Sequence, residues 1–179
     1  MKKTLLSAMI AAGVIAISQN AMAADGTITF NGNITAQTCT INGNGSGSKD
    51  FTITLPTVSS STLASAGQTA GRTPFNIALT NCTPNTGNVH AFFEAGPTTD
   101  ATTGRLILNA GGATNVQLGL LNSDFTEIKA GFADASQNSK SVAITSGSAT
   151  LPYYVQYVAT GTASAGAANS SVLYTIAYQ

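Results

Sequence analysis

The C-terminal stretch YYVQYVATGTASAGAANSSVLYTIAYQ, residues 153–179, contains two apolar alternations separated by a turn-rich connection. In its second half, Val172, Tyr174, Ile176 and Tyr178 occupy every second position, which places four large side chains on one face of a β-strand. The connection between the alternations is rich in Gly, Ser and Thr, residues that favour turns over continued regular structure. This stretch therefore predicts two strands joined by a loop, the second strand covering about residues 171–179.

The same two-residue period recurs toward the N-terminus. No segment sustains the 3.6-residue apolar period of a capped amphipathic helix, and only residues 62–66 predict a helical turn. Short alternating segments in a single domain predict an all-β fold, most simply an immunoglobulin-like sandwich. The alternating residues upstream and in the quoted stretch are Ile28/Phe30/Gly32/Ile34, Phe51/Ile53/Leu55, Phe75/Ile77/Leu79, Val116/Leu118/Leu120, Leu151/Tyr153/Val155/Tyr157 and Val172/Tyr174/Ile176/Tyr178.

The N-terminus has the three regions of a secretory signal. Lys2 and Lys3 precede a nearly uncharged run at 4–17, and the small-residue triplet Ala-Met-Ala follows at 21–23. The apolar run is short for a membrane span, so a membrane anchor or a core helix fits less well. We therefore predict a signal peptide over residues 1–23, which leaves 156 residues for one folded domain.

Two cysteines, Cys39 and Cys82, follow the predicted cleavage site. An even cysteine count in an exported chain favours a disulfide, and the close C-x-x-C spacing of redox motifs is absent. Closing so long a loop would stabilise the fold by about 3–4 kcal/mol in the chain-entropy model. The sequence therefore predicts a structural disulfide between these two residues.

Charge is scarce in this chain and argues against several classes of partner. Charged residues make up 8% of the sequence, and without Lys2 and Lys3 five basic and seven acidic residues remain, a net charge of −2. No basic patch is available to neutralise phosphates, so nucleic-acid binding is disfavoured. A surface covered mainly by Ser, Thr, Asn, Gln and Gly suits an extracellular protein packed among copies of itself.

No arrangement of catalytic or metal-binding residues emerges from the sequence. His90 is the single histidine, no G-x-S-x-G motif occurs, and both cysteines are expected to be bonded. The glycine-rich run at 43–47 lacks the Gly-Lys-Ser/Thr of a phosphate-binding loop, so it is interpreted as a turn or loop. His90 is interpreted as a strand or loop residue near 89–93. We predict no enzyme activity, cofactor or metal.

Four segments together resemble the major pilins of type 1-like chaperone–usher fimbriae. They span nearly all of the chain after the signal peptide, and the C-terminal block with its penultimate Tyr178 and with Gly166 fourteenth from the end is the most specific. The segments are GTITFNGNITAQTC at 26–39, FNIALTNC at 75–82, ATNVQLGLLN at 113–122 and the stretch at 153–179 quoted above.

The resemblance implies an incomplete immunoglobulin-like β-sandwich that is completed by a donor strand from a neighbouring subunit. An N-terminal extension, residues 24–37, is expected to be the donor, and residues 38–179 are expected to form the pilin domain. The donor residues are expected to be Gly26, Ile28, Phe30, Gly32 and Ile34. The strand that lines the acceptor groove and binds a chaperone is expected to involve Gly166, Val172, Tyr174, Ile176, Tyr178 and Gln179.

Gly32 falls on the apolar face of the expected donor strand, where its neighbours are large. A glycine in such a series suggests a point where another backbone approaches closely, and the matching glycine of the family sits in the shallowest part of the groove. An ordinary first strand with a bulge glycine is the alternative.

The resemblance also implies partners and a location. The chain is expected to form a homopolymer and to meet a periplasmic pilus chaperone, an outer-membrane usher, other pilins and a tip adhesin. It is expected to pass through the periplasm to a surface fimbria that supports cell adhesion. A minor adaptor or terminator pilin of the same fimbria is the main alternative. A free secreted carbohydrate-binding sandwich and a small secreted enzyme are the others.

Overall fold

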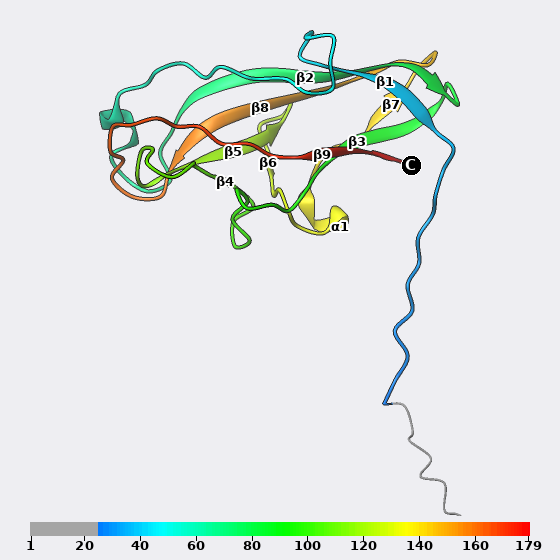
Figure 1. Ribbon diagram of the computed structural model, residues 1–179, viewed down its shortest axis with the longest axis horizontal. Helices are drawn as coiled ribbons and strands as arrows, with labels where there is room; N and C mark the ends of the chain where they lie inside the picture. The colour runs from blue at the N-terminus through cyan, green and yellow to red at the C-terminus, as the bar shows by residue number, and fades with distance from the viewer. Residues whose placement is uncertain (1–24) are drawn as a thin grey trace, which may run out of the picture. The chain divides into compact units, whose positions relative to one another are not determined.

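The computed structural model describes residues 25–179, so the predicted signal peptide and its cleavage site lie outside the described residues (Figure 1). The chain divides into two units, one ending at Ile34 and one covering Thr35–Gln179. In the first unit, residues 26–34 are extended, form no strand and expose their side chains. No helix within the described part of the chain is long and apolar enough to cross a membrane.

The second unit is built almost entirely of strands. Its two helical segments are single turns, a 3-10 helix η1 (Ser60–Leu63) and a helix α1 (Asp134–Gln137). The strands are β1 (Thr38–Gly43), β2 (Thr69–Thr83), β3 (Gly87–Phe93), β4 (Leu106–Ile107), β5 (Val116–Asn122), β6 (Glu127–Ile128), β7 (Val142–Ile144), β8 (Ala149–Ala159) and β9 (Tyr174–Tyr178).

The strands form two sheets, and all the pairings within them are antiparallel. The larger sheet has the order β1-β2-β8-β5-β4, with β6 paired to β5, and the smaller one has the order β7-β3-β9. In Figure 1 the long ribbons of β2 and β8 run side by side, and β9 ends at the marked C-terminus. Because β3 separates β7 from β9, both β7 and β9 are edge strands of the smaller sheet.

The core lies between the two sheets, because the apolar side chains that alternate along β2 and β8 point to the same side of the larger sheet. Phe75 of β2 is paired with Tyr153 of β8, and their ring centroids lie 5.6 Å apart. Phe93 of β3 approaches the same tyrosine from the other sheet, at 5.4 Å and nearly edge-on. Ile77 and Leu151 are paired beside them and fully buried. These contacts make the second unit a two-layer sandwich with one apolar core.

Strand β7 pairs with only the first part of β3, and side chains take its place along the rest of that edge. The pairing of β3 with β7 ends at Val89, although Ala91 and Phe93 direct their backbone groups to the same side. Tyr153 Oη accepts a hydrogen bond from the Ala91 amide at 3.1 Å. The buried amide of Gln137 accepts from the Phe93 N–H at 2.6 Å and donates to its carbonyl at 2.9 Å, as a neighbouring strand would. The Ala91 N–H and both backbone groups of Phe93, which would otherwise belong to an open edge, are therefore hydrogen-bonded.

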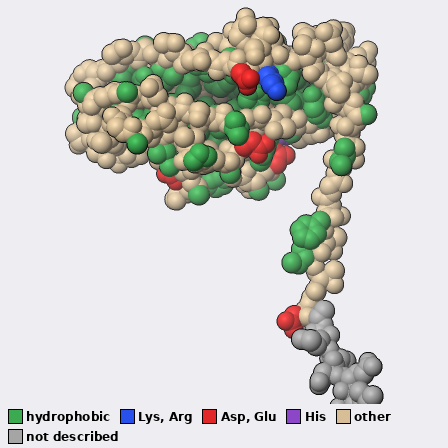
Figure 2. All heavy atoms as spheres, in the orientation of Figure 1, with side chains coloured by type: hydrophobic (Ala, Val, Ile, Leu, Met, Phe, Trp, Pro, Cys, Tyr) green, Lys and Arg blue, Asp and Glu red, His purple; other side chains and the backbone are tan. Residues whose placement is uncertain are grey.

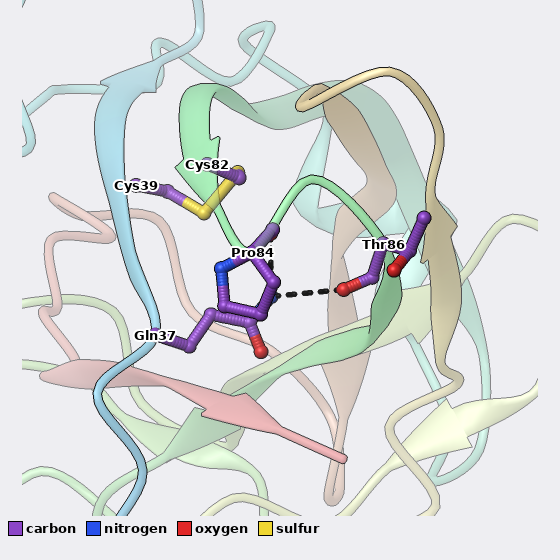
Figure 3. Close-up of a disulfide and its surroundings, with 5 residues drawn as sticks. All are labelled: Gln37, Cys39, Cys82, Pro84 and Thr86. Carbon is purple, nitrogen blue, oxygen red and sulfur yellow. Dashed lines mark hydrogen bonds between the residues drawn. A yellow bond between two sulfur atoms is a disulfide. The ribbon is translucent and has the colours of Figure 1, made fainter.

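Cys39 and Cys82 form a disulfide that joins β1 to β2, with the two Cα atoms 4.1 Å apart (Figure 3). The register of this strand pair shifts between Thr38 and Thr40, so the bond lies at the irregularity. Gln37, just before β1, donates weakly to the carbonyls of Pro84 and Thr86, both at 3.4 Å. The start of β1 is thus held covalently and by these contacts.

Thiol labelling of unreduced fibres is expected to modify neither Cys39 nor Cys82, because both sulfur atoms are bonded to each other. Replacing both by serine is expected to lower the free energy of unfolding by about 3–4 kcal/mol. Mass spectrometry after alkylation and urea titration measure the two effects. Quantitative labelling of both cysteines without reductant would rule the bond out.

The fold agrees with the sequence expectations except in four segments. The runs at 75–79, 116–120 and 151–157 lie in strands β2, β5 and β8 as predicted. Residues 51–55 alternate in burial like a strand but pair with none within residues 25–179, and residues 26–34 likewise form no strand. The helical turn predicted at 62–66 lies slightly earlier, at Ser60–Leu63, and the turn at α1 was not predicted.

Candidate functional site: an open groove beside the C-terminal strand

Strand β9 has one paired edge and one open edge. On the paired side, Glu94 N donates to Leu173 O at 2.8 Å, and Gln179 exchanges two hydrogen bonds with Asn88. Along an antiparallel pair, every second residue directs its backbone N–H and C=O groups to the partner strand. In β9 the odd-numbered residues hydrogen-bond to β3 in this way, and the even-numbered residues direct their backbone groups to the other edge. The backbone N–H and C=O groups of Val172, Tyr174, Ile176 and Tyr178 therefore point to an edge that carries no strand within residues 25–179.

A groove of about 650 Å³ lies beside this open edge and reaches the core. One wall is formed by residues 170–176, which include the first part of β9. Its floor is apolar and comes from both sheets. The floor residues are Phe75, Ile77, Phe93, Leu106, Leu118, Leu120 and Val155. The core of the sandwich is thus accessible along one line instead of being sealed by a further strand.

The opposite wall is the extended run at 49–55, which includes Phe51, Ile53 and Leu55. These three side chains are partly buried and pack against the core, while the threonines between them are exposed. Gly43 of β1 makes room for the run, because a Cβ atom there would overlap the Phe51 ring. The groove therefore has an apolar wall on each side.

At one end of the groove the two walls touch. Tyr174 Oη donates a hydrogen bond to the Lys49 carbonyl at 2.7 Å, and the Tyr174 and Phe51 rings are 6.1 Å apart. Burial, assisted by the nearby Asp50 carboxylate, raises the pKa of Tyr174 above its ordinary value. The phenol is protonated at neutral pH, as an ordinary tyrosine is, and the raised pKa extends its ability to donate this hydrogen bond to higher pH. Burial also raises the pKa of Tyr178.

The structure places the expected groove residues in different positions. Tyr174, Ile176 and Tyr178 lie in β9 with their side chains on the core side, and Val172 lines the groove just before the strand. Gln179 extends the pairing with β3 by one residue. Gly166 lies away from the groove in the β8–β9 connection, where an added Cβ would come within 2.7 Å of the Ala113 nitrogen. This close approach, together with a φ of 156°, accounts for a glycine there.

The expected donor residues lie in the exposed extension, and Figure 2 shows hydrophobic side chains along it. Ile28 is 80% exposed, Phe30 88% and Ile34 99%. Free exposure of three large apolar side chains on one short segment is unfavourable in water unless a partner covers them. Gly26 and Gly32 belong to the same segment, and a Cβ on either would meet no atom within 4 Å.

The histidine has a structural setting in β3. His90 is buried, and its Nε2 lies 2.7 Å from Oδ1 of the more exposed Asp134. In the described part of the chain the one side-chain hydrogen bond of His90 goes to Asp134 and not to a serine hydroxyl, and both cysteines are bonded to each other. Within residues 25–179 no group of three or more His, Cys, Asp or Glu side chains could hold a metal ion.

A family model described as "Type-1 fimbrial protein, A" matches residues 55–179. The chain belongs to this family of fimbrial subunits. The matched range contains β2 to β9 and the β9 wall of the groove, whereas of the wall at 49–55 it includes only Leu55. The family consists of structural pilins and is not an enzyme family, and its members are subunits of surface fimbriae.

Relatives of this fimbrial subunit cover nearly its whole length. The major fimbrial subunit SMF-1 of Stenotrophomonas maltophilia is 53% identical over 176 residues, which is 95% of this chain and 99% of that protein. The F17 fimbrial protein of Escherichia coli is 49% identical over 175 residues, covering 93% of this chain and 96% of that protein. The chain is thus a structural subunit of a fimbria.

Solved structures agree on the fold. The type I fimbria protein BPSL1626 of Burkholderia pseudomallei superposes with a TM-score of 0.58 at 27% identity, covering 79% of this chain and 99% of that one. The P pilus rod subunit PapA gives a TM-score of 0.60 at 19% identity over 79% of this chain and 99% of its own. The fold is accordingly the incomplete immunoglobulin-like sandwich of pilins.

The sequence led us to expect a groove wall at one of the two wall segments and not at the other. The alternation at 172–178 predicted a strand and the resemblance implied that this strand lines a groove, whereas 51–55 was recognised only as a strand-like run. In the run at 51–55, threonines alternate with Phe51, Ile53 and Leu55, and this alternation indicates an amphipathic segment. Nothing local in the sequence tells whether such a segment pairs with a strand or borders a gap.

Proposed function

We propose that this fimbrial subunit polymerises by donor-strand exchange, in which residues 24–37 of one copy enter the groove of the next. The observation that carries the proposal is the open edge of β9 beside an apolar groove, in a chain that also has an exposed apolar extension. A strand added to a sheet edge gains backbone hydrogen bonds, and its alternate side chains enter pockets. Ile28, Phe30 and Ile34 would each contribute about 1.5–3 kcal/mol on burial.

The dimensions of donor and acceptor support the same pairing. The span from residue 28 to residue 34 is matched by the span from 172 to 178, and each covers about 20 Å as an extended strand. The even-numbered residues of both segments carry the large side chains, apart from Gly32. If the donor segment lies antiparallel to β9, its backbone groups can hydrogen-bond to the free N–H and C=O groups of β9 along the whole matched span.

The open edge also supports a requirement for a chaperone before assembly. An apolar groove next to an unpaired edge strand favours aggregation while it is empty. We propose that a periplasmic chaperone covers it during export and that an outer-membrane usher exchanges the chaperone for the next donor extension. One relative in fold, at 22% identity and a TM-score of 0.60, is a chaperone–usher pilus.

Changing Phe30 to Asp is expected to abolish polymers, because a carboxylate cannot be buried in an apolar groove without a partner. Thr29→Asp is the matched control, since residue 29 faces the opposite side of the extended segment and should retain assembly. Polymer yield and resistance to detergent dissociation measure the effect in cells that export both variants normally. Equal assembly of both variants would contradict the assigned donor face.

The proposed role is that of the shaft subunit, with a minor adaptor or terminator as the alternative. Deletion of the chain and electron microscopy of the cells distinguish the two. We expect the whole shaft to disappear, as for a major subunit. Shafts that persist with altered number or length would instead assign a minor position.

A further inference from the structure

Three asparagines in the described chain are followed by glycine, namely Asn31, Asn42 and Asn44. In an Asn-Gly pair the backbone nitrogen of the glycine can attack the side-chain amide carbon of the asparagine. The glycine offers the least steric obstruction to this attack, because it has no side chain. The reaction also needs a backbone that is free to bring the two atoms together, so the setting of each pair decides its reactivity.

Two of the pairs lie at the end of β1 and in the turn that follows it. Gly43 N donates to Ser48 O at 2.7 Å, which engages the nitrogen that would attack Asn42. Asn42 Oδ1 accepts from Gly47 N at 2.9 Å, which fixes its side chain as well. Asn44 N donates to Asn76 O at 2.7 Å, and Asn44 has a left-handed φ of 49°. The turn therefore restrains both pairs.

The third pair lies in the exposed extension. Asn31 and Gly32 are both exposed, belong to no strand and take part in no hydrogen bond described for residues 25–34. A Cβ at Gly32 would meet no atom within 4 Å, so no distant part of the chain crowds this glycine. Asn33 shares this setting but precedes Ile34, whose branched side chain shields the backbone nitrogen.

We propose that Asn31 is a site of spontaneous deamidation in the unassembled subunit. The Gly32 nitrogen forms a bond to Asn31 Cγ, the bond from Cγ to the amide nitrogen breaks, and ammonia leaves with the transferred proton. The resulting succinimide is opened by one water molecule at either carbonyl. Opening at one carbonyl gives aspartate, and opening at the other gives isoaspartate, in which the main chain runs through the former side chain.

Isoaspartate at position 31 disrupts the donor face, a consequence that rests on the proposed function. The extra main-chain carbon lies between Phe30 and Ile34, so the two-residue alternation is broken at that point. Ile28 and Phe30 then lose phase with Ile34, and the three side chains no longer enter the groove together. A donor strand already paired in a fibre has a fixed backbone, so assembly protects Asn31. Unassembled subunits thus lose competence with age, whereas assembled ones keep their asparagine.

The test incubates the chain at mildly alkaline pH as dissociated subunits and as fibres, followed by peptide mapping and isoaspartyl methylation. We expect isoaspartate to accumulate at residue 31 of dissociated subunits several-fold faster than at 33, 42 or 44, with loss of assembly. Absence of isoaspartate at 31 in dissociated subunits overturns the inference, whatever the donor mechanism. If isoaspartate forms at residue 31 equally fast in fibres and in dissociated subunits, the inference that assembly protects Asn31 is overturned, while the deamidation itself is supported.

Two variants separate the effects of charge and of the backbone change. Asn31→Gln should keep its assembly after the same incubation, because the longer side chain closes a ring far less readily. Asn31→Asp carries the negative charge without the extra main-chain carbon and should assemble when fresh. If Asn31→Asp fails to assemble as aged subunits do, the break in alternation is not the cause and that step is overturned.

Discussion

A second copy of residues 25–36, joined after Gln179 by a short turn, is expected to give a soluble monomer with a much higher melting temperature. The appended segment can fold back as a hairpin onto the open edge of β9, since antiparallel strands are readily joined by tight turns. Burial of Ile28, Phe30 and Ile34 adds about 1.5–3 kcal/mol each, and each kcal/mol shifts the midpoint by about 2–4 °C in a domain of this size. We expect a rise on the order of 10–30 °C.

The matched control carries the same appended segment with serine at the copied positions of Ile28, Phe30 and Ile34. It keeps the length and the backbone hydrogen-bonding groups but cannot fill the groove. Size-exclusion chromatography and thermal unfolding compare both with the unextended chain, which should self-associate because its groove is open. The missing-strand assignment fails if the unextended chain is already monomeric and as stable as the extended one.

Gly32→Leu is expected to block polymerisation while leaving the subunit itself intact. An added side chain meets no atom within 4 Å in the extension, so the substitution causes no strain before assembly. Within the groove, the same side chain would face the floor and hold the donor away from β9. Overpacking alone costs about 1–3 kcal/mol, and the neighbouring backbone hydrogen bonds would open as well. Polymer yield and detergent resistance measure this loss.

Asn31→Leu and Asn33→Leu are the controls for this substitution, because their side chains lie on the opposite face of the extended segment. They add similar apolar volume at the adjacent positions and should assemble nearly as well as the unaltered chain. Export and chaperone binding of all three variants are measured first. Wild-type assembly of Gly32→Leu would contradict the groove assignment, whereas failure of that variant alone would support it.

Strands with one face toward the core could be predicted from the sequence, because their alternation is plain. Phe75, Ile77 and Leu79 of β2 are buried, and the residues between them are less so. Strand β3 was harder to recognise, since His90 is buried on one face while Val89 and Ala91 are buried on the other. Alternation disappears when both faces are covered.

The parts of the site that the sequence did not reveal depend on contacts between distant segments. Gln137 lies in a short polar turn, and only its hydrogen bonds to Phe93 show its role. Gly166 was placed with the groove because it precedes β9 in the C-terminal block, yet its backbone is needed against Ala113. Neither contact leaves a local pattern, because each joins residues more than forty positions apart.

The closed edge of β3 sets how many neighbours a subunit can bind through its smaller sheet. Gln137 and Tyr153 occupy groups beyond β7, and β7 itself is only three residues long, so in the described part of that sheet the open edge that borders an apolar groove is that of β9. One acceptor and one donor extension give each subunit a valence of two. Polymers built by the proposed exchange would then be linear and unbranched, with two unlike ends, and their growth would leave the number of reactive ends unchanged.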